Sequence, residues 1–401
     1  MKALDGVRVV ELAGPFGGYC GRMFAGLGAD VVLVEPAAGA PTRGEAPFLD
    51  ALPGQDRSLR FAYENAGKRS VVLDAEADAA GMAALVSGAQ IVIESGKPGA
   101  LAHQGLGYDR LAALNPALVL ISITGFGQTG PYAHYEAADI VALALGGMMS
   151  LAGYPDAPPL AAYGGQAIAA GAMFGAVAGL AALLRAEATG EGDHVDVSLQ
   201  ESVAMGLENA AQFYDLERIV RRRQAGHQAR AGNGLFACKD GSVFLMSAGV
   251  GDNRFWHNTV AWLESAGIAG VGELREKRWE DDNFLVGDEA KQIFLRIFGA
   301  FAGARSKREL YVEGQAWRVP ICPVQTPADV IADAQLRHRG FFVEVAQAAG
   351  GRTLAMPGAP YALKATPWAI TRRAPQPDEH GAVIRSGLGQ ALARAKQGAG
   401  T

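Results

Sequence analysis

ISITGFGQTGPYAHYEAAD, from Ile121 to Asp139, opens the part of the sequence that decides the fold. ALGGMMSLAGYPDAPPL (Ala144 to Leu160) follows, and a long Ala- and Gly-rich segment then leads into TGEGDHVDVS (Thr189 to Ser198). The order predicts a buried strand, a Gly-Gln-Thr-Gly-Pro turn, a helix, a Pro-Pro segment, a second helix and another strand. The sequence before this part has the pattern of an α/β half-domain. The sequence after it predicts a smaller domain, after which the chain returns to the first domain.

The first residues carry a strand–helix–strand pattern. Val7 to Leu12 and Asp30 to Glu35 are apolar runs of strand length, and an amphipathic segment from Tyr19 to Leu27 separates them. Such a unit favours a parallel sheet with a right-handed crossover. The glycines between the strands do not have the G-x-G-x-x-G spacing of dinucleotide-binding loops, so we expect no NAD.

The remaining elements follow from periodicity and from the positions of Pro and Gly. In the first half, strands are expected at 70–73, 90–94 and 117–123, with a helix at 77–88 and another beginning at Lys97-Pro98-Gly99. A helix through 201–223 and a hairpin at 235–248 are expected next, followed by a mainly helical segment to 318 with Trp256, Trp262 and Trp279 in its core. The last part is expected to contain a helix starting at Pro327, a strand pair at 340–345 and 353–357, and a polar surface tail beyond Arg373 that ends in a helix.

Composition is that of an ordinary globular protein, with 49% hydrophobic and 19% charged residues among 401. This length predicts two or three domains. The N-terminus has no signal-peptide organisation and no apolar run has the length of a membrane span, so we expect a cytoplasmic protein. A net charge of −5 argues against a nucleic-acid partner. The three cysteines are far apart, and each is expected to be buried and inert.

A few basic positions are candidates for contact with an anion. Lys68 and Arg69 precede the strand at 70–73, beside a turn whose backbone N–H groups can face an anion. Lys97 follows the strand at 90–94, at the edge where open α/β sheets bind ligands. The run Arg221 to Arg223 is expected to be a solvated helix end, with a phosphate contact as the alternative.

Several motifs, taken together, carry a resemblance that covers nearly the whole chain. They are LDGVRVVEL, LGADVVLVEP, NAGKRSVVLD, ESGKPGAL, LGYDRLAALNP, FGQTGPY, TGEGDHVDVS, CKDGSV, VPICPV and RGFFVEV. In this order they resemble the class III CoA-transferases, the family of formyl-CoA transferase and carnitine CoA-transferase, which also includes acyl-CoA racemases.

The resemblance implies an α/β fold with a Rossmann-like large domain and a smaller α+β domain. The large domain would comprise residues 1–205 and 325–401, and the small domain residues 226–318. Each chain would form an open ring, and two rings would interlock into a dimer. Coenzyme A or acyl-CoA would be a substrate, with no metal.

The resemblance also implies which residues lie along CoA. Carried over by position, the contacts fall at Pro15, Phe16, Pro36, Leu73, Asp74, Ala75, Glu76, Ser95, Gly96, Lys97 and His103, and in the segment from Glu136 to Asp139. A basic or polar residue is common in the family where Pro36, Ser95 and His103 stand here.

In the family, an aspartate near the start of the helix after the Pro-Pro segment attacks the thioester carbonyl. A mixed anhydride and the CoA thiolate form, the thiolate returns to give an aspartyl-CoA thioester, and the acceptor carboxylate opens that thioester. The pattern places this aspartate four residues before Gly171, where the chain has Ala167, preceded by Gln166. No carboxylate occurs from Leu160 to Leu184, so we assign no catalytic residue.

Other acids are weaker candidates. Asp139 is expected to be structural or to support the site, and would be a substitute nucleophile only as an alternative. Asp156 is expected in a surface turn. The racemases use a His before the acid at position 139, and this chain has Ala138. Glu191 and His194 are spaced as Glu-x-x-His but stand where a Gly-rich turn enters a strand, so we expect a solvated turn and no metal site.

Three hypotheses follow. The first is a subunit without the nucleophile, paired with a homologous Asp-bearing class III subunit, as in the benzylsuccinate CoA-transferases of anaerobic toluene degradation, with succinyl-CoA as donor and an aromatic carboxylic acid such as benzylsuccinate as acceptor. The second is a stand-alone transferase that uses a different residue, and the third is a non-catalytic CoA-binding protein. A lining of Gly146, Gly147, Met148, Met149, Tyr163 and Phe174 would allow a bulky acid, with ordinary packing of these residues as the alternative.

Overall fold

The computed structural model describes residues 2–74, 77–223, 228–248, 253–347 and 351–388. The chain divides into two compact units. The large unit comprises Met1–Met148, Ala161–Leu216 and Gln335–Thr401, and the small unit comprises Met149–Leu160 and Glu217–Ala334. Each unit therefore contains segments that are distant in the sequence.

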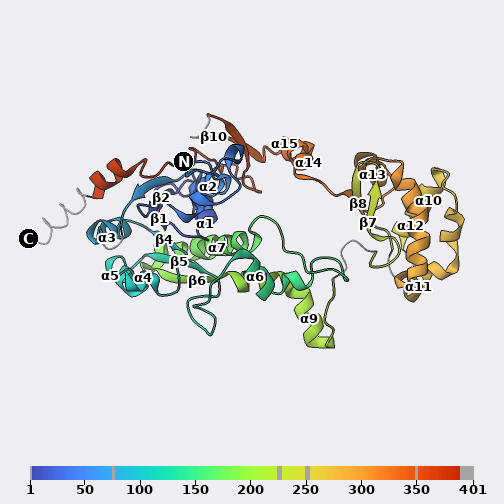
Figure 1. Ribbon diagram of the computed structural model, residues 1–401, viewed down its shortest axis with the longest axis horizontal. Coiled ribbons are helices and arrows are strands. Elements are labelled where there is room, and N and C mark those ends of the chain that lie inside the picture. Colours follow the sequence, from blue (N-terminus) through green and yellow to red (C-terminus); the bar gives the residue numbers. More distant parts are fainter. Residues whose placement is uncertain (1, 75–76, 224–227, 249–252, 348–350, 389–401) are drawn as a thin grey trace, which may run out of the picture. The chain divides into compact units, whose positions relative to one another are not determined.

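The large unit is built on a six-stranded sheet in the order β3-β2-β1-β4-β5-β6, in which every pairing is parallel (Figure 1). The direction in which strands are added changes between β1 and β4, and α/β sheets bind ligands beside such a point. The strands are β1 (Arg8–Leu12), β2 (Asp30–Glu35), β3 (Arg69–Val72), β4 (Ile91–Glu94), β5 (Val119–Thr124) and β6 (Asp193–Ser198).

Helices cover both faces of this sheet. Helix α7 (Gln166–Thr189) lies on β5 and β6 beside α1 (Gly18–Leu27), whereas α3 (Ala79–Ser87) packs against α5 (Tyr108–Leu114). The other helices of this unit are α2 (Leu59–Asn65), α4 (Ala100–His103), α6 (Asp139–Leu145), α8 (Leu199–Ala204), α9 (Glu208–Glu217) and α15 (Ala334–His338), which begins at the last residue of the small unit. The α/β class with a parallel sheet, predicted from the sequence, is confirmed.

Small residues let α7 approach the sheet closely. A Cβ atom added at Gly171 would lie 2.3 Å from Leu199 Cδ2, and one added at Gly179 would lie 2.4 Å from Ile121 Cδ1. Gly171, Gly175 and Gly179 recur at a spacing of four residues and therefore lie on one face of the helix. Contrary to the expectation from the sequence, one apolar run, helix α7, is long enough to cross a membrane by length and composition, but half of that apolar stretch is buried within the protein.

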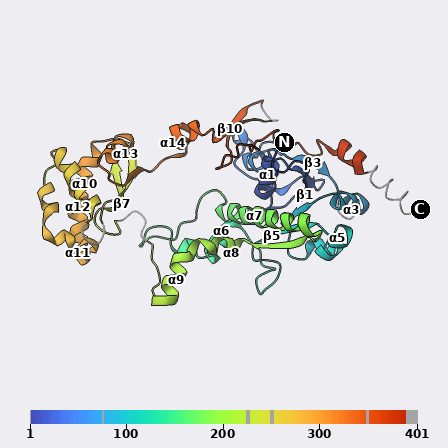
Figure 2. The same ribbon diagram turned by 180° about the vertical axis from the view of Figure 1, so that it is seen from behind.

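The last described residues complete the α3 side of the large unit (Figure 2). Ile384 is buried with Val71, Met82 and Val86, and Arg385 donates to the carbonyl oxygen of Val72. The prediction of a surface tail beyond Arg373 is therefore wrong for these residues, because one apolar side chain in the polar segment packs into the core. The predicted strand pair is present as β10 (Phe342–Ala346) and β11 (Thr353–Pro357), which are antiparallel.

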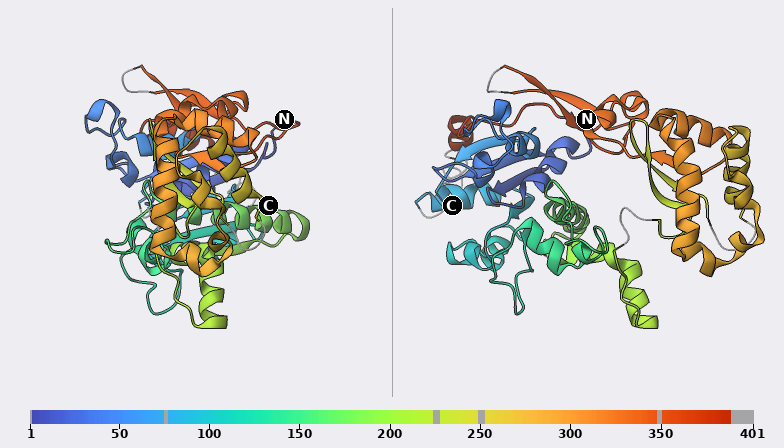
Figure 3. Two further views of the ribbon diagram at one scale, coloured as in Figure 1. Left: turned by 90° about the vertical axis from the view of Figure 1, so that its right-hand side faces the viewer. Right: turned by 45° about the vertical axis from the view of Figure 1, so that its right-hand side comes forward.

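The small unit combines a three-stranded sheet with helices (Figure 3). The expected hairpin is present as β7 and β8, and the three tryptophans are buried, as predicted. Pro327 is the first residue of α14, as expected, and Thr326 caps that helix. The elements are β7 (Asn233–Cys238), β8 (Gly241–Met246), β9 (Ile321–Pro323), α10 (Arg254–Ser265), α11 (Asp282–Val286), α12 (Asp288–Gly303), α13 (Lys307–Ala316) and α14 (Pro327–Ala332).

Three further expectations are wrong. The helix expected through 201–223 is divided, and α9 ends at Glu217. Arg223 is therefore not a solvated helix end, and its guanidinium donates to the carbonyl oxygens of Tyr154 and Ala157. Of the cysteines, Cys20 is buried as expected, but Cys322 is exposed on a short strand of the small unit.

Candidate functional site

The start of α7, where the family pattern would place its aspartate, is capped by a carboxylate from elsewhere in the chain. Gly164 and Gly165 have φ of +89° and +73°, and Gly165, the residue that precedes the helix, has no side chain to cap it. Asp139 Oδ1 accepts hydrogen bonds from the backbone N–H groups of Ala167 at 2.8 Å and Ile168 at 3.1 Å. Asp139 is also the first residue of α6, so two helix N-termini converge on it.

The two residues at the expected nucleophile position have different surroundings. Ala167 is fully buried, whereas Gln166 is exposed and donates from Nε2 to the carbonyl oxygen of Tyr163. Asp156 lies in an exposed turn, as expected. Asp139 is thus the carboxylate that contacts the start of α7. One of its oxygens, Oδ1, accepts the N–H groups of the helix.

The loops after β1 and β4 meet where the strand order changes direction. Ser95 Oγ accepts hydrogen bonds from the backbone N–H groups of Phe16 and Gly17, each at 3.2 Å. The carbonyl oxygen of Pro15 accepts from the Arg60 guanidinium at 2.8 Å. Ser95 and Phe16 are both buried. The structure therefore brings together Pro15, Phe16 and Ser95, three residues carried over as CoA contacts.

The other residues carried over as CoA contacts are spread along the carboxyl ends of the strands. Pro36, Asp74 and His103 are exposed, and Leu73 is buried. Asp74 accepts from the backbone N–H of Ala77, and Gly96 donates its N–H to Glu94 at 2.8 Å. Lys97 forms an ion pair with Glu136. Ala75 and Glu76 lie outside the described residues.

The anion contact predicted for Lys68 and Arg69 is wrong, because carboxylates of the chain itself hold both cations. Lys68 is fully buried, and its Nζ donates to Glu11, Asn65 and the carbonyl oxygen of Gly18 at 2.6 to 2.8 Å. Arg69 forms an ion pair with Asp30. Burial raises the pKa of Glu11 to about 7, against the opposing effect of the Lys68 ammonium group.

A row of polar residues on β4, β5 and β6 was missed by the sequence reasoning. Glu94 pairs in register with Ser122, and Ser122 pairs with Asp196. Gln128 joins the row from the turn after β5, because its backbone N–H donates to both oxygens of Asp196 and its Nε2 donates to Glu94 at 3.3 Å. Burial raises the pKa of Glu94, and Asp196 adds to that rise. The sequence does contain a polar residue near the end of each of the three apolar strands, and this pattern could have predicted the row.

The interpretation of Glu191 and His194 as a solvated turn is wrong for the histidine. His194 lies in β6, half-buried, with Nε2 at 2.9 Å from Ser122 Oγ and its ring stacked on Tyr108. Burial lowers the pKa of His194. Glu191 is exposed and pairs with Arg185. Among the described residues, no group of three His, Cys, Asp or Glu side chains is placed to hold a metal ion.

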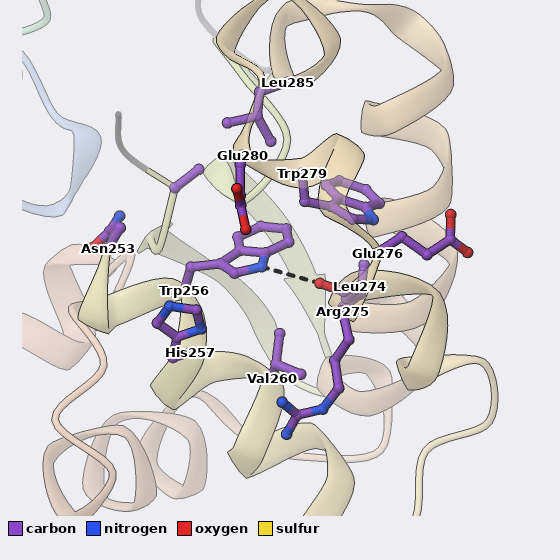
Figure 4. A pocket seen from close by; sticks show the side chains of 11 residues that line it. Asn253, Trp256, His257, Val260, Leu274, Arg275, Glu276, Trp279, Glu280 and Leu285 are labelled. Carbon is purple, nitrogen blue, oxygen red and sulfur yellow. Dashed lines mark hydrogen bonds between the residues drawn. The ribbon is translucent and has the colours of Figure 1, made fainter. Parts of the chain in front are cut away.

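The small unit contains a pocket of about 410 Å³ that is formed entirely by its own residues (Figure 4). Trp256 and Trp279 stack with ring centroids 5.0 Å apart, and Trp256 donates its indole N–H to the carbonyl oxygen of Leu274. Trp279 donates to the carbonyl oxygen of Glu273. No residue carried over as a CoA contact lines this pocket in the part of the chain that the structure describes.

Comparisons with known proteins agree over nearly the full length. The model of CoA-transferase family III matches residues 4–381. The chain is 39% identical over 376 residues to the succinyl-CoA:(R)-benzylsuccinate CoA-transferase subunit BbsE of Thauera aromatica, covering 93% of this chain and 91% of that protein. It is 32% identical over 394 residues to the succinate–glutarate CoA-transferase of Agrobacterium fabrum, covering 96% and 95%. A CAIB/BAIF family protein from Brucella suis has a similar solved structure, with a TM-score of 0.83, 31% identity, and coverage of 96% and 99%.

Proposed function

Because the chain belongs to CoA-transferase family III, we propose that it is the subunit of a heteromeric CoA-transferase that lacks the aspartate nucleophile and pairs with a homologous Asp-bearing subunit in the cytoplasm. The assembly moves CoA from an acyl-CoA donor, succinyl-CoA, to an aromatic carboxylic acid such as benzylsuccinate. The observation that carries the proposal is Ala167, a fully buried residue without a carboxylate where the family reaction needs one.

Covalent transfer needs a carboxylate oxygen that is free to attack a thioester. In this chain the acid closest to that role, Asp139, uses Oδ1 as the acceptor of two backbone N–H groups. Those bonds hold the carboxylate against the start of α7 and restrict its movement toward a thioester. The geometry thus favours a nucleophile from the partner chain over a stand-alone transferase that uses Asp139.

An exposed apolar face on α7 supports a protein partner. Met173, Phe174, Val177 and Leu184 are 48%, 44%, 68% and 67% exposed. They lie on the side of α7 opposite the glycines that face the sheet. Large apolar side chains that are exposed together on one face of a helix are typical of an interaction site. We assign this face to the homologous subunit, in an interlocked dimer of two open rings.

The large unit is proposed to carry the CoA surface. Its strand order, with a change of direction between β1 and β4, supports a Rossmann-like domain, and CoA would lie along the loops after β1, β2, β3, β4 and β5. The backbone around Pro15, Phe16 and Ser95 is proposed as the centre of this surface, and Asp74, Gly96, Lys97 and His103 are proposed to lie farther along it. Tyr163, which is 93% exposed, is proposed to line the acyl group, and Phe174 is proposed to lie where the acyl group and the partner's surface meet.

The test is reconstitution. The chain is purified alone and together with a homologous class III chain that has aspartate at the position matching Ala167, and succinyl-CoA-dependent formation of benzylsuccinyl-CoA is measured. We expect exchange from the pair only, and we expect borohydride added with succinyl-CoA to convert an aspartate of the partner into an alcohol. Full turnover by this chain alone, or a modified residue within it, would overturn the proposal.

A further inference from the structure

The pocket of the small unit has a mixed lining of indole rings and charged side chains (Figure 4). It lies between α10 and the segment that contains α11 and two short 3₁₀ helices, Val271–Arg275 and Lys277–Glu280. Its volume of about 410 Å³ is typical of pockets that hold small organic molecules. The side chains with polar groups are Asn253, Trp256, His257, Arg275, Glu276, Trp279 and Glu280.

Trp256 and Trp279 form a fixed aromatic wall of this pocket. Their rings stack with centroids 5.0 Å apart, and the Trp279 ring also packs edge-on against Phe284 with centroids 5.1 Å apart. Each indole N–H donates to a backbone carbonyl oxygen, and the two residues are only 8% and 5% exposed. The wall is thus in place before any ligand arrives, which lowers the conformational entropy lost on binding. The negative face of an indole ring attracts a cation.

Two charged residues of the lining are already neutralised by ion pairs within the small unit. Arg275 donates from Nε and Nη2 to the two carboxylate oxygens of Glu264, at 2.5 and 2.6 Å. Glu276 forms an ion pair with Arg278. The positive charge of Arg275 and the negative charge of Glu276 are therefore each balanced by a neighbour outside the lining.

Glu280 differs from these two residues. Its carboxylate forms no hydrogen bond or ion pair with another residue in the part of the chain that the structure describes. Figure 4 shows this carboxylate pointing toward the indole of Trp256. The remaining titratable side chain of the lining is His257, and its neutral form leaves the charge of Glu280 uncompensated. The lining therefore combines an aromatic wall with one unbalanced negative charge.

We propose that this pocket binds a small organic ammonium ion, with the cation held by the Glu280 carboxylate and the indoles of Trp256 and Trp279. A carboxylate and an aromatic face attract the same charge, so both parts of the lining favour this ligand. The inference goes beyond the proposed function, because acyl-CoA and the carboxylic acid acceptor are anions and the ammonium ion would be a third molecule. The site also lies wholly within the small unit.

The test is calorimetric titration of the purified full chain with two cations and their neutral counterparts of similar shape. The pairs are choline with 3,3-dimethylbutan-1-ol and benzylamine with benzyl alcohol. We expect at least one cation to bind, and its neutral counterpart to bind about 10-fold more weakly or not at all. Equal binding of each cation and its counterpart, or no binding of either cation, would overturn the proposal.

Variants locate the site. Glu280→Gln keeps the size of an exposed side chain and removes its charge, and should raise the Kd of the cation by about 10-fold. The matched control is Glu289→Gln, which removes an exposed carboxylate on α12 that does not line the pocket and should leave the Kd within about 2-fold of wild type. Equal effects of the two glutamine variants would place the cation elsewhere and overturn the proposal.

A second pair of variants tests the aromatic wall. Trp279→Phe retains an aromatic face and should keep most of the binding, whereas Trp279→Leu should weaken it. Thermal unfolding shows whether each variant is folded, and Glu280→Gln decides the outcome if Trp279→Leu is not. Acyl exchange by the reconstituted pair is measured separately, so a failure of this site and a failure of the proposed function give different results.

Discussion

Asp139 Oδ1 lies 2.8 Å from the backbone nitrogen of Ala167, across 28 positions of the sequence, and accepts its N–H. The same oxygen accepts from Ile168, so one carboxylate satisfies two of the N–H groups that the start of α7 would otherwise leave without a partner. The helix is 24 residues long and packs on the sheet, so its first turn matters for the large unit as a whole.

Asp139→Ala should therefore destabilise the chain. Loss of a helix cap of this kind costs about 1–2 kcal/mol, and Asp139→Asn should cost less because its amide oxygen can still accept. Urea unfolding followed by circular dichroism measures both. Asp156→Ala, in an exposed turn, is the control and should change stability by no more than about 0.5 kcal/mol. Equal effects at the two positions would contradict the capping role.

Replacing Ala167 by aspartate should not restore a transferase in this chain alone. Position 167 is fully buried, and its N–H already faces Asp139, so a second carboxylate there would be desolvated beside a like charge. We expect Ala167→Asp to lower stability by about 2 kcal/mol or more. Gln166→Asp adds the same group at the exposed neighbouring position and should be close to neutral, since an acid is favoured at a helix N-terminus.

Both variants are assayed for acyl exchange and for borohydride trapping with succinyl-CoA. We expect neither to show exchange without the partner chain. Turnover by Ala167→Asp at the rate of the reconstituted pair would mean that a single missing carboxylate is all that separates this chain from a complete enzyme.

The buried pair of Lys68 and Glu11 should be strongly coupled. Lys68→Met leaves Glu11 buried without its cation and should cost about 3–5 kcal/mol near neutral pH, with a smaller cost near pH ~5, where the carboxyl can stay protonated. The double variant Lys68→Met with Glu11→Leu should be less destabilised than Lys68→Met alone. Arg69→Met, which breaks a partly exposed pair with Asp30, is the control and should cost about 1 kcal/mol or less. Additive single effects would argue against coupling.

The fold was predictable where a local pattern determines it. Apolar runs of strand length and the turn residues between them gave β1, β2, the β7–β8 hairpin and the β10–β11 pair with boundaries shifted by a residue or two. These features depend on residues close in sequence, so periodicity is enough. Ile384 shows the limit, because a single apolar residue in a polar segment does not reveal that it packs on Val71 and Met82.

The candidate site was less predictable because its contacts join distant residues. Lys68 and Glu11 are separated by 57 positions. The sequence therefore showed a cation at the start of a strand, but not that the carboxylate of Glu11 pairs with it. Asp139 was expected to be structural, but its hydrogen bonds to the start of α7 could not be derived from spacing. The absence of a carboxylate at Ala167, in contrast, is a property of the sequence itself.

The buried Glu94 should make stability depend on pH. Burial raises its pKa above the ordinary value of 4.5, so between that value and its folded pKa the native state binds more protons than the unfolded state. Stability contributed by this group is therefore full below pH 4.5 and is lost as the pH rises through the folded pKa. In Glu94→Gln, the free energy of unfolding relative to that of the wild type should rise as the pH rises above 4.5. A difference that is constant with pH would show that Glu94 does not titrate in this range.

The exposed face of α7 should be required for association with the partner chain. Val177 is 68% exposed on that face, and a carboxylate there would have to be desolvated in an apolar interface. We expect Val177→Glu to leave the thermal unfolding of the isolated chain within about 2 °C of wild type and to abolish co-purification and acyl exchange with the partner. Val312→Glu, at a 56% exposed position on α13, is the matched control and should retain both. Full exchange by Val177→Glu would show that α7 is not part of the interface. The partner would then have to contact another surface of the large unit.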